Sequence, residues 1–324
     1  MNPSDHIYIA GHRGMVGSAI LRLLEKKGYN NICTASKEEL DLRDSEQVET
    51  FFHKNKPDYV FLAAAKVGGI QANIDDPVAF LSDNIMIQNN IITQCFLNKV
   101  KKILYLGSSC IYPKECPQPM KEESLLTGPL EPTNEGYALA KIIGFKLLQY
   151  YNRQYGMSFV SPMPCNLYGP GDSFDLKTSH VLSALVKRFV DSVNENKNEV
   201  ELFGSGIARR EFMHVDDLAE ACLILMQNFS KPELINIGWG KDISIKELAY
   251  LVAEKANYKG LIKFDHSKPD GMLRKCLDIQ KMHEIGFKPK IGLDEGISQM
   301  IRIYNSGLEN CNDLNHTPCP TIKK

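Results

Sequence analysis

The feature that most constrains the fold is a regular alternation of short apolar runs and amphipathic segments over residues 1–170. Strands that alternate with helices in this way build a parallel sheet with helices on both of its faces. The predicted strands are residues 7–10, 32–35, 59–64, 103–106 and 159–163. The predicted helices between them are residues 16–27, 45–54, 80–98 and 137–155. The sequence therefore predicts an α/β protein built on a doubly wound parallel sheet.

The pattern loosens after residue 170, where a helix over residues 179–194 and a strand over residues 200–203 are predicted. The shorter elements that follow indicate a smaller α/β unit, and the last residues show almost no apolar periodicity. We expect a dinucleotide-binding domain at residues 1–170 and a mainly substrate-binding domain at residues 171–307, whose chain can cross back to the first sheet. Residues 308–324 are expected to form a loose tail.

The charge balance and the composition exclude several classes of partner. The 38 Lys and Arg residues are matched by 39 Asp and Glu residues, so the formal net charge of -1 gives no global field for nucleic acid or an acidic membrane. No apolar run approaches the ~20 residues that span a bilayer, and residues 1–6 lack the apolar stretch of an export signal. The nine cysteines include no C-x-x-C pair, which fits a reducing compartment and argues against zinc. We expect a soluble, cytoplasmic protein with no metal, no nucleic-acid partner and no membrane partner.

Three glycines follow the first predicted strand with the spacing G-x-x-G-x-x-G. Gly11, Gly14 and Gly17 lie where that strand ends and the first predicted helix begins. Glycines permit a tight turn and a close approach of the backbone, so a pyrophosphate can bind free N–H groups at the positive end of the helix. An ordinary glycine-rich turn is the alternative, but the position favours a dinucleotide-binding site of the Rossmann type.

The end of the second predicted strand bears on the choice of nicotinamide cofactor. NAD-selective sites usually place Asp or Glu there to bind the ribose 2′-hydroxyl, whereas this strand ends in Ala35-Ser36-Lys37. Arg13 and Lys37 can instead pair with a 2′-phosphate, so NADP(H) is the predicted cofactor. A solvated Lys37 is the alternative, and the two glutamates that follow it mean that NADH is still an alternative cofactor.

Three residues in a fixed chain order indicate a proton-transfer group. Ser108 follows the strand predicted at residues 103–106, and Tyr137 and Lys141 lie four residues apart on one face of a predicted helix. A lysine ammonium beside a phenol favours the phenolate, so we expect Lys141 to lower the pKa of Tyr137 from about 10 toward working pH. A surface pair on the helix is the alternative, but the combination with Ser108 and the glycine loop favours catalysis.

With these features in place, the chain resembles the GDP-L-fucose synthase family of the extended short-chain dehydrogenase/reductase superfamily. The resemblance extends over roughly residues 6–305. The motifs that carry it are G-H-R-G-M-V-G-S-A at 11–19, A-A-A-K-V-G-G-I at 63–70, G-S-S-C-I-Y-P at 107–113, E-P-T-N-E-G-Y-A at 131–138, N-L-Y-G-P at 166–170, S-H-V at 179–181, G-S-G at 204–206, R-E-F-M-H-V-D-D at 210–217 and K-P-D-G at 268–271.

The resemblance implies two reactions on one bound sugar. GDP-4-keto-6-deoxy-D-mannose is epimerised at C3 and C5 and is then reduced at C4 by NADPH, which gives GDP-L-fucose. In such enzymes the residues at the positions of Cys110 and His180 are the base and acid pair of the epimerisation. Tyr137 then protonates the C4 oxygen, assisted by Ser108 and Lys141. A buried core cysteine and a solvated histidine are the alternatives for the first pair, and we expect His180 to supply the positive charge that favours a thiolate.

The resemblance also implies a set of binding residues. The cofactor would be held by Gly11, His12, Arg13, Gly14, Met15, Val16, Gly17, Leu40, Ala63, Ala64, Lys66, Leu106, Gly107, Ser108, Lys141, Pro164, Asn166, Leu167 and His180. The GDP-sugar would contact Arg188, Phe203, Arg210 and Asp270. The chain departs from the family pattern at Phe203, where tryptophan is common, and at Ala35 and Lys37, where an arginine is often seen. A homodimer that pairs through the helices at 80–98 and 137–155 is implied by the resemblance alone.

Other functions are compatible with the same motifs. A nucleotide-sugar 4-reductase or 4-epimerase on a related GDP-sugar would use the same fold, although the presence of both Cys110 and His180 argues against a simple reductase. A 4,6-dehydratase would need a carboxylate beside the serine, and Ser109-Cys110 offers none. A cofactor-binding regulator without chemistry is the alternative from another class, and the presence of Tyr137 and Lys141 argues against it.

Overall fold

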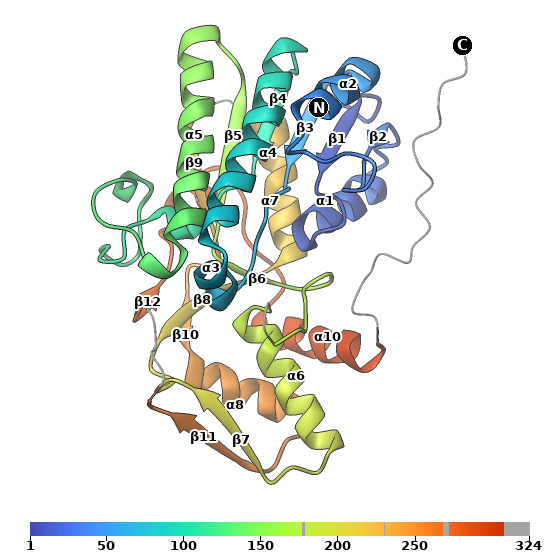
Figure 1. The fold of residues 1–324 in the computed structure, drawn as a ribbon. Coiled ribbons are helices and arrows are strands. Elements are labelled where there is room, and N and C mark those ends of the chain that lie inside the picture. Colours follow the sequence, from blue (N-terminus) through green and yellow to red (C-terminus); the bar gives the residue numbers. More distant parts are fainter. Residues whose placement is uncertain (177–178, 230, 268–271, 308–324) are drawn as a thin grey trace.

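The computed structural model describes residues 1–176, 179–229, 231–267 and 272–307 (Figure 1). Two predictions, the nucleotide contact at Asp270 and the loose tail, lie outside these residues. Two hydrophobic clusters form the interior of the described residues. One surrounds a six-stranded sheet, and the smaller one lies below it in the view of Figure 1.

The larger cluster surrounds a sheet whose strands are all parallel. In spatial order they are β2 (Ile32–Cys33), β1 (Ile7–Ala10), β3 (Tyr59–Leu62), β4 (Lys102–Tyr105), β5 (Phe159–Pro164) and β9 (Leu234–Ile237). β1, β3 and β4 are buried along almost their whole length, as expected for strands covered on both faces. The sheet confirms the predicted doubly wound α/β fold.

Five long helices cover the two faces of this sheet. They are α1 (Met15–Lys26), α2 (Ser45–Asn55), α4 (Pro77–Leu97), α5 (Glu135–Tyr155) and α7 (Val215–Asn228). α4 and α5 pack against each other on one face with α2 beside α4, whereas α1 and α7 pack against each other on the opposite face (Figure 1). In sheets built this way, ligands bind at the carboxyl ends of the strands.

The sixth strand of the sheet comes from the second half of the chain. β9 pairs in parallel with β5, from the Ser161–Leu234 pair to the Pro164–Ile237 pair, and α7 precedes it directly. The six-stranded sheet therefore contains residues from both sides of residue 170, and the predicted domain boundary there stays a prediction.

Lys102 links the C-terminal end of α7, the helix before β9, to the central sheet. Its buried ammonium group donates to carbonyl oxygens at the end of α7, to Leu225 at 2.8 Å and Met226 at 3.1 Å, and also to that of Phe229. A cation at a helix C-terminus satisfies free carbonyl groups and complements the helix dipole. The contact therefore ties the end of α7 to β4.

The smaller cluster lies among short sheets and helices. Their bounds are β6 (Asn166–Tyr168), β7 (Glu199–Phe203), β8 (Arg209–His214), β10 (Asp242–Ser244), β11 (Leu261–Asp265), β12 (Arg274–Lys275), α6 (Val181–Asn194), α8 (Ile245–Lys255), α9 (Gln280–Glu284) and α10 (Leu293–Asn305). β8 is central, since it pairs antiparallel with β10 and parallel with β12 and β6, while β7 pairs in parallel with β11. α6, α8 and α10 pack on one another around this cluster.

The predicted elements differ from the structure mainly at their ends. α4 begins at Pro77 and not at residue 80, because the missing N–H of proline costs nothing in the first helical turn. β2 ends at Cys33 and not at residue 35. Before β5, four short elements are absent from the prediction, namely α3 (Ile70–Asp75) and the 3-10 turns η1 (Ser109–Ile111), η2 (Glu122–Ser124) and η3 (Pro132–Asn134).

Candidate active site

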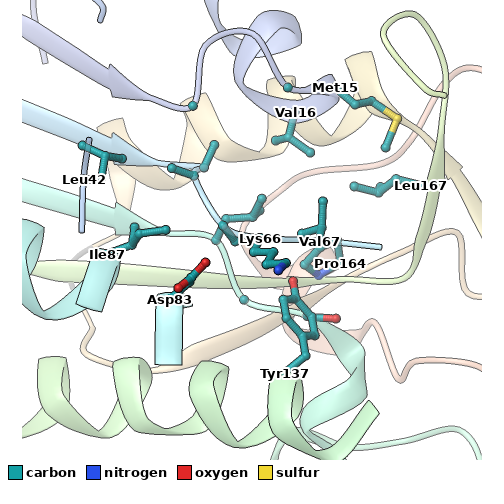
Figure 2. Close-up of a pocket in the computed structure, with 18 of the residues that line it drawn as sticks. Met15, Val16, Leu42, Lys66, Val67, Asp83, Ile87, Tyr137, Pro164 and Leu167 are labelled. Carbon is teal, nitrogen blue, oxygen red and sulfur yellow. The ribbon is translucent and has the colours of Figure 1, made fainter. Parts of the chain in front are cut away.

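A cavity of about 680 Å³ opens at the carboxyl ends of the central strands (Figure 2). The chain passes from β1 to β2 on one side and continues with β3 on the other, so the strand order reverses between β1 and β3. Such a switch point is where ligands bind in doubly wound sheets. The cavity is lined by the residues that directly follow β1, β3, β4 and β5, which are Gly11, Ala63, Leu106 and Cys165.

Most of the residues predicted to hold a cofactor line this cavity. They are Gly11, Gly14, Met15, Val16, Leu40, Ala63, Ala64, Lys66, Leu106, Gly107, Ser108, Pro164, Asn166, Leu167 and His180. The other predicted cofactor residues, which are outside the cavity wall, are His12, Arg13, Gly17 and Lys141. Polar residues of the wall that the sequence does not single out include Asp41, Arg43, Asp83 and Lys275.

The glycine loop has the close packing that a pyrophosphate site needs. A Cβ on Gly17 would lie 2.0 Å from the carbonyl oxygen of Gly11, and a Cβ on Gly11 would lie 2.8 Å from backbone atoms of Ala64. Gly14 caps α1 without a side-chain hydrogen bond, and the first turn of α1 carries no acidic residue. The N–H groups and the positive dipole at this helix start therefore suit an anion such as a dinucleotide pyrophosphate.

The segment after β2 presents a cation to the cavity. Lys37 lines the wall, whereas Arg13 is 61% exposed and pairs with Glu38, with 3.3 Å between Nη1 and Oε2. An exposed ion pair of this kind contributes little to the stability of the folded protein. The Glu39 carboxylate accepts a hydrogen bond from the Ser36 N–H at 2.8 Å. Both glutamates thus have local partners, and among residues 34–40 Lys37 is the charged residue in the cavity wall.

A second charged group lies on the same wall. Arg43 pairs with Asp41, at 2.6 Å between Nη2 and Oδ2, and with Asp83, at 3.4 Å between Nη1 and Oδ2. All three residues line the cavity, and Figure 2 shows the Asp83 carboxylate pointing into it. Asp83 lies on α4, and only the packing of α4 beside α2 brings it to Arg43. No spacing in the sequence could have indicated this cluster.

The proton-transfer residues meet at the carboxyl end of β4. Ser108 and Tyr137 line the cavity, and Tyr137 lies in the first turn of α5 (Figure 2). Lys141 lies one turn further along α5 and is buried. Its Nζ donates to the carbonyl oxygen of Leu106 at 2.7 Å and lies 5.7 Å from the centre of the Tyr137 ring. Strand end and helix start thus place a hydroxyl, a phenol and an ammonium group together.

The prediction that the pKa of Tyr137 lies below its ordinary value is wrong. Burial raises the pKa of the Tyr137 phenol above its ordinary value, and burial also lowers the pKa of Lys141 to about 8. The Lys141 ammonium group donates to a neutral backbone carbonyl oxygen, so its positive charge remains near the Tyr137 ring. Tyr137 is therefore a neutral phenol near neutral pH, which is the form that can donate a proton.

Cys110 lies in η1, two residues after Ser108. The Ser108 Oγ caps this turn and accepts a hydrogen bond from the Cys110 N–H at 3.4 Å. The thiol is buried, and burial raises its pKa, while Lys275, Ser108 and Lys141 act in the opposite direction. Lys275 is thus the first of the groups that favour the thiolate, and the expectation that His180 supplies positive charge stays a prediction.

Lys275 is a residue of the site with no sequence signal of its own. It lies on β12, and its pairing opposite Arg210 on β8 brings it to the cavity wall. Burial lowers the pKa of its ammonium group. Its place four residues after the K-P-D-G motif is the one clue that could have indicated it.

His180 reaches the same cavity from the second half of the chain. It is the N-cap of α6, its side chain is 44% exposed, and its Nδ1 lies 3.2 Å from the Asp172 Oδ1. The hydrogen bond to Asp172 raises the pKa of the imidazole above its ordinary value. One cavity thus brings Ser108, Tyr137 and His180 together, with Cys110 in the turn that Ser108 caps.

Three of the residues predicted to hold the nucleotide lie on the smaller unit, outside the wall of this cavity, and they are Arg188, Phe203 and Arg210. The Arg188 guanidinium on α6 lies over the Phe203 ring, 5.3 Å from its centre, and Nη1 donates to the Glu201 carbonyl oxygen at 2.9 Å. Phe203 ends β7 and is 63% exposed. The Arg210 Nη1 on β8 donates to the Met272 carbonyl oxygen at 2.6 Å. The structure thus joins Arg188 and Phe203 as a stack and places Arg210 on a different strand.

The described ranges lack two features that would indicate other classes of protein. No three His, Cys, Asp or Glu side chains in those ranges gather as they would around a metal ion. None of the helices there has the length and apolar character that crossing a membrane requires.

Known proteins resemble this chain over nearly its whole length. The model of the NAD dependent epimerase/dehydratase family matches residues 7–238. The GDP-L-fucose synthase of Escherichia coli (strain K12) is 49% identical over 315 residues, which are 94% of this chain and 97% of that protein. A GDP-L-fucose synthetase from Naegleria fowleri, solved with NADP bound, superposes with a TM-score of 0.87 at 28% identity over 95% of this chain and 96% of that one. The GDP-mannoheptose C4 reductase MlghC from Campylobacter jejuni, also with NADP bound, superposes with a TM-score of 0.86 at 39% identity over 94% of this chain and 99% of that one.

Proposed function

The chain belongs to the NAD dependent epimerase/dehydratase family and, within it, to the GDP-L-fucose synthases, and from this we propose that it converts GDP-4-keto-6-deoxy-D-mannose to GDP-L-fucose. The conversion takes two stages, epimerisation at C3 and C5 and then NADPH-dependent reduction at C4. One observation carries the proposal. A single cavity is lined by Ser108 and Tyr137, which suit the reduction, and by His180, which suits the epimerisation, with Cys110 two residues after Ser108.

In the proposed epimerisation, Cys110 and His180 move protons at the carbons beside the C4 ketone. The ketone acidifies the protons at C3 and C5, so a side chain can remove each one and another can return it on the opposite face. The Cys110 thiol serves as the base. Burial raises the pKa of this thiol overall, and Lys275 and Lys141 favour its thiolate and oppose part of that rise. The His180 imidazolium, favoured by Asp172, donates from the ring nitrogen that does not face that carboxylate.

In the proposed reduction, Tyr137 donates a proton to the C4 oxygen. Burial keeps its phenol protonated, and the Ser108 hydroxyl can donate a hydrogen bond to the same oxygen. When bound, NADPH supplies the hydride for C4. The Lys141 ammonium group, held by the Leu106 carbonyl oxygen, favours the negative charge that Tyr137 acquires as its proton leaves.

The proposed binding sites divide between the two halves of the molecule. The cofactor pyrophosphate would bind at Gly11, Gly14 and the start of α1, and a 2′-phosphate would bind Lys37. The nucleotide of the sugar would bind at the smaller unit, where the stack of Arg188 on Phe203 offers an aromatic face and a guanidinium group.

The same proposal includes a cytoplasmic homodimer. α4 and α5 expose apolar side chains that a second copy would cover, namely Val78, Met86, Leu139 and Ile143. The cysteines in the described ranges are all free, which suits a reducing compartment. The mass of the purified protein in solution tests the assembly.

The decisive experiment follows the two stages separately. The protein is incubated with GDP-4-keto-6-deoxy-D-mannose in heavy water, first without and then with NADPH. NMR follows deuterium at C3 and C5, and absorbance follows the oxidation of NADPH. The proposal expects deuterium uptake before NADPH is added and oxidation after it, and it fails if neither signal appears.

A C4 reductase that does not epimerise is the second candidate. The 39% identity to the GDP-mannoheptose C4 reductase of Campylobacter jejuni favours it. Oxidation of NADPH without deuterium at either carbon, in the same experiment, would identify this activity. The position of His180 in the cavity wall and of Cys110 in the turn after Ser108 favours the enzyme with both activities.

Replacing Lys37 with alanine is expected to weaken the binding of NADPH and to leave the binding of NADH nearly unchanged. A charge-assisted contact to phosphate contributes about 1.5 to 3 kcal/mol, so the Kd for NADPH should rise roughly 10- to 150-fold. Fluorescence titration with each cofactor measures the two constants. Lys26→Ala, at the far end of α1, is the control. Equal increases in both constants in Lys37→Ala would assign it no part in cofactor choice.

The rate of reduction is expected to fall as the pH rises through about 8. Burial lowers the pKa of Lys141 to about 8, so the ammonium form that favours proton donation by Tyr137 is present below that pH and is lost above it. The pH dependence of kcat/KM for NADPH reports on groups of the free enzyme and measures this fall. Lys141→Arg keeps its charge over the whole range and should remove the fall, whatever its absolute rate. A fall that persists in this variant belongs to another group.

A further inference from the structure

A buried carboxylate supports the His180 ring from behind the cavity wall. The Asp172 Oδ1 lies 3.2 Å from the His180 Nδ1, and Asp172 is 5% exposed. His180 lines the cavity and Asp172 does not. Any part that Asp172 has in the reaction therefore acts through His180.

Two further donors hold the Asp172 carboxylate in one orientation. The Ser183 hydroxyl, on α6, donates to Oδ2, and the Ser173 N–H donates to Oδ1 at 2.9 Å. A carboxylate accepts hydrogen bonds and donates none, so the proton between Asp172 and His180 lies on Nδ1. The other ring nitrogen, Nε2, is then left to exchange protons with a ligand in the cavity.

The position of His180 at a helix start gives the carboxylate a second effect. His180 is the N-cap of α6, and the positive end of a helix dipole disfavours an imidazolium there. The hydrogen bond to Asp172 acts in the opposite direction and raises the pKa of the ring. Tyr137 from α5 and Lys275 from β12 share the cavity wall with His180 and carry no negative charge at neutral pH. Of the residues that the structure describes, Asp172 is the carboxylate paired with His180.

The loop that carries Asp172 is held against the cofactor-binding loop. The Asp172 N–H donates to the Gly169 carbonyl oxygen at 3.1 Å, and Gly169 and Gly171 have φ angles of 141° and 87°. A Cβ on Gly171 would lie 3.3 Å from the Met15 Cα at the start of α1. The same contacts that place Asp172 therefore bring the second half of the chain against the glycine loop.

From this geometry we propose that Asp172 is a positioning residue for the epimerisation, an inference that rests on the function proposed above. Asp172 holds the His180 ring with Nδ1–H toward the carboxylate and Nε2 toward the sugar. It also favours the imidazolium that returns a proton to C3 or C5. The pair is a carboxylate–imidazole dyad between the loop after β6 and the start of α6.

The first test needs no substrate. ¹⁵N NMR of histidine-labelled protein reports both the tautomer and the pKa of His180. In the unmodified protein we expect neutral His180 to carry its proton on Nδ1, and in Asp172→Asn we expect the pKa of His180 to fall. Asp172→Glu should restore part of that pKa, and Asp175→Asn, which removes a charge from the same loop, should leave it unchanged. A proton on Nε2, or a pKa that is the same in Asp172→Asn as in the unmodified protein, overturns the proposal.

The second test measures deuterium exchange at C3 and C5 of GDP-4-keto-6-deoxy-D-mannose. Asp172→Asn is expected to slow exchange at the carbon that His180 serves about 10- to 100-fold, below the range of about 10²- to 10⁴-fold for a proton-transfer group itself. Its affinity for NADPH should be unchanged. In a His180→Asn background the same substitution should have no further effect, because Asp172 then has nothing to position. Equal losses in both backgrounds would give Asp172 a purely structural part and overturn the proposal.

The two tests separate this inference from the proposed function. An unmodified protein that exchanges no deuterium contradicts the function, and the NMR result still decides whether Asp172 holds His180. Exchange in the unmodified protein that is equally fast in Asp172→Asn overturns the positioning role and leaves the function standing. If Asp172→Asn does not fold, Ser183→Ala replaces it, since loss of one donor to Asp172 should give a smaller fall in exchange with the same dependence on His180.

Discussion

Replacing Cys110 with serine is expected to slow deuterium exchange at C3, C5 or both by about 10²- to 10⁴-fold, the usual contribution of a general base. A serine hydroxyl ionises far less readily than a thiol, so the variant has no comparable base at this position. Serine has nearly the shape of cysteine, so the η1 turn and its Ser108 cap should keep their places. Exchange in heavy water without NADPH isolates this step from the reduction.

The matched control for this variant is Cys116→Ser. Cys116 is a partly exposed cysteine outside the cavity wall, and its replacement should leave both exchange and reduction unchanged. Cys110→Ser should also bind NADPH with its normal affinity, because the glycine loop and Lys37 are untouched. Exchange at the normal rate in Cys110→Ser would remove Cys110 from the mechanism.

Replacing Tyr137 with phenylalanine is expected to slow the reduction by about 10²- to 10⁴-fold and to leave deuterium exchange largely intact. The variant lacks the phenol proton that the C4 oxygen would receive. Phenylalanine keeps the ring that packs edge-on against Phe80, with 6.4 Å between the ring centres, so the start of α5 should keep its place. Single-turnover oxidation of NADPH gives the reduction rate, and NMR gives the exchange rate.

Tyr150→Phe is the control on the same helix. Tyr150 lies on the exposed side of α5 and is 53% exposed, so both rates should equal those of the unmodified protein. Equal losses of exchange and reduction in Tyr137→Phe would mean that this phenol serves both stages, and a normal reduction rate would require another proton donor.

The first half of the fold and the cofactor loop can be predicted because a few neighbouring residues determine each feature. β1 has the predicted bounds. α5 ends at Tyr155 because Gly156 adopts the left-handed conformation, with φ at 73°, as a glycine after a helix commonly does. The G-x-x-G-x-x-G spacing likewise predicts a tight turn, and the structure shows Gly11 and Gly17 in contact.

The rest of the site depends on contacts between residues far apart in the chain. Lys275 enters the cavity only because β12 pairs with β8, opposite Arg210, and no periodicity in such short strands specifies their partner. Asp172, which pairs with His180, directly follows a turn in which Gly169 and Gly171 have positive φ, and no spacing indicates this pairing. The pKa of Tyr137 was predicted with the wrong sign, because spacing shows that Lys141 is near but does not show how deeply the phenol is buried.

The return of the chain to supply β9 imposes an order on biosynthesis. β5 acquires its outer neighbour only when Ile237 has been made, 73 residues after Pro164 (237 − 164). At ribosomal rates of about 5 to 20 residues per second this takes roughly 4 to 15 s, and during that time the outer edge of β5 is an open template for other chains. A nascent chain therefore passes through a stage in which Ser108, Cys110 and Tyr137 have all been synthesised, while the sheet still lacks β9 at the outer edge of β5.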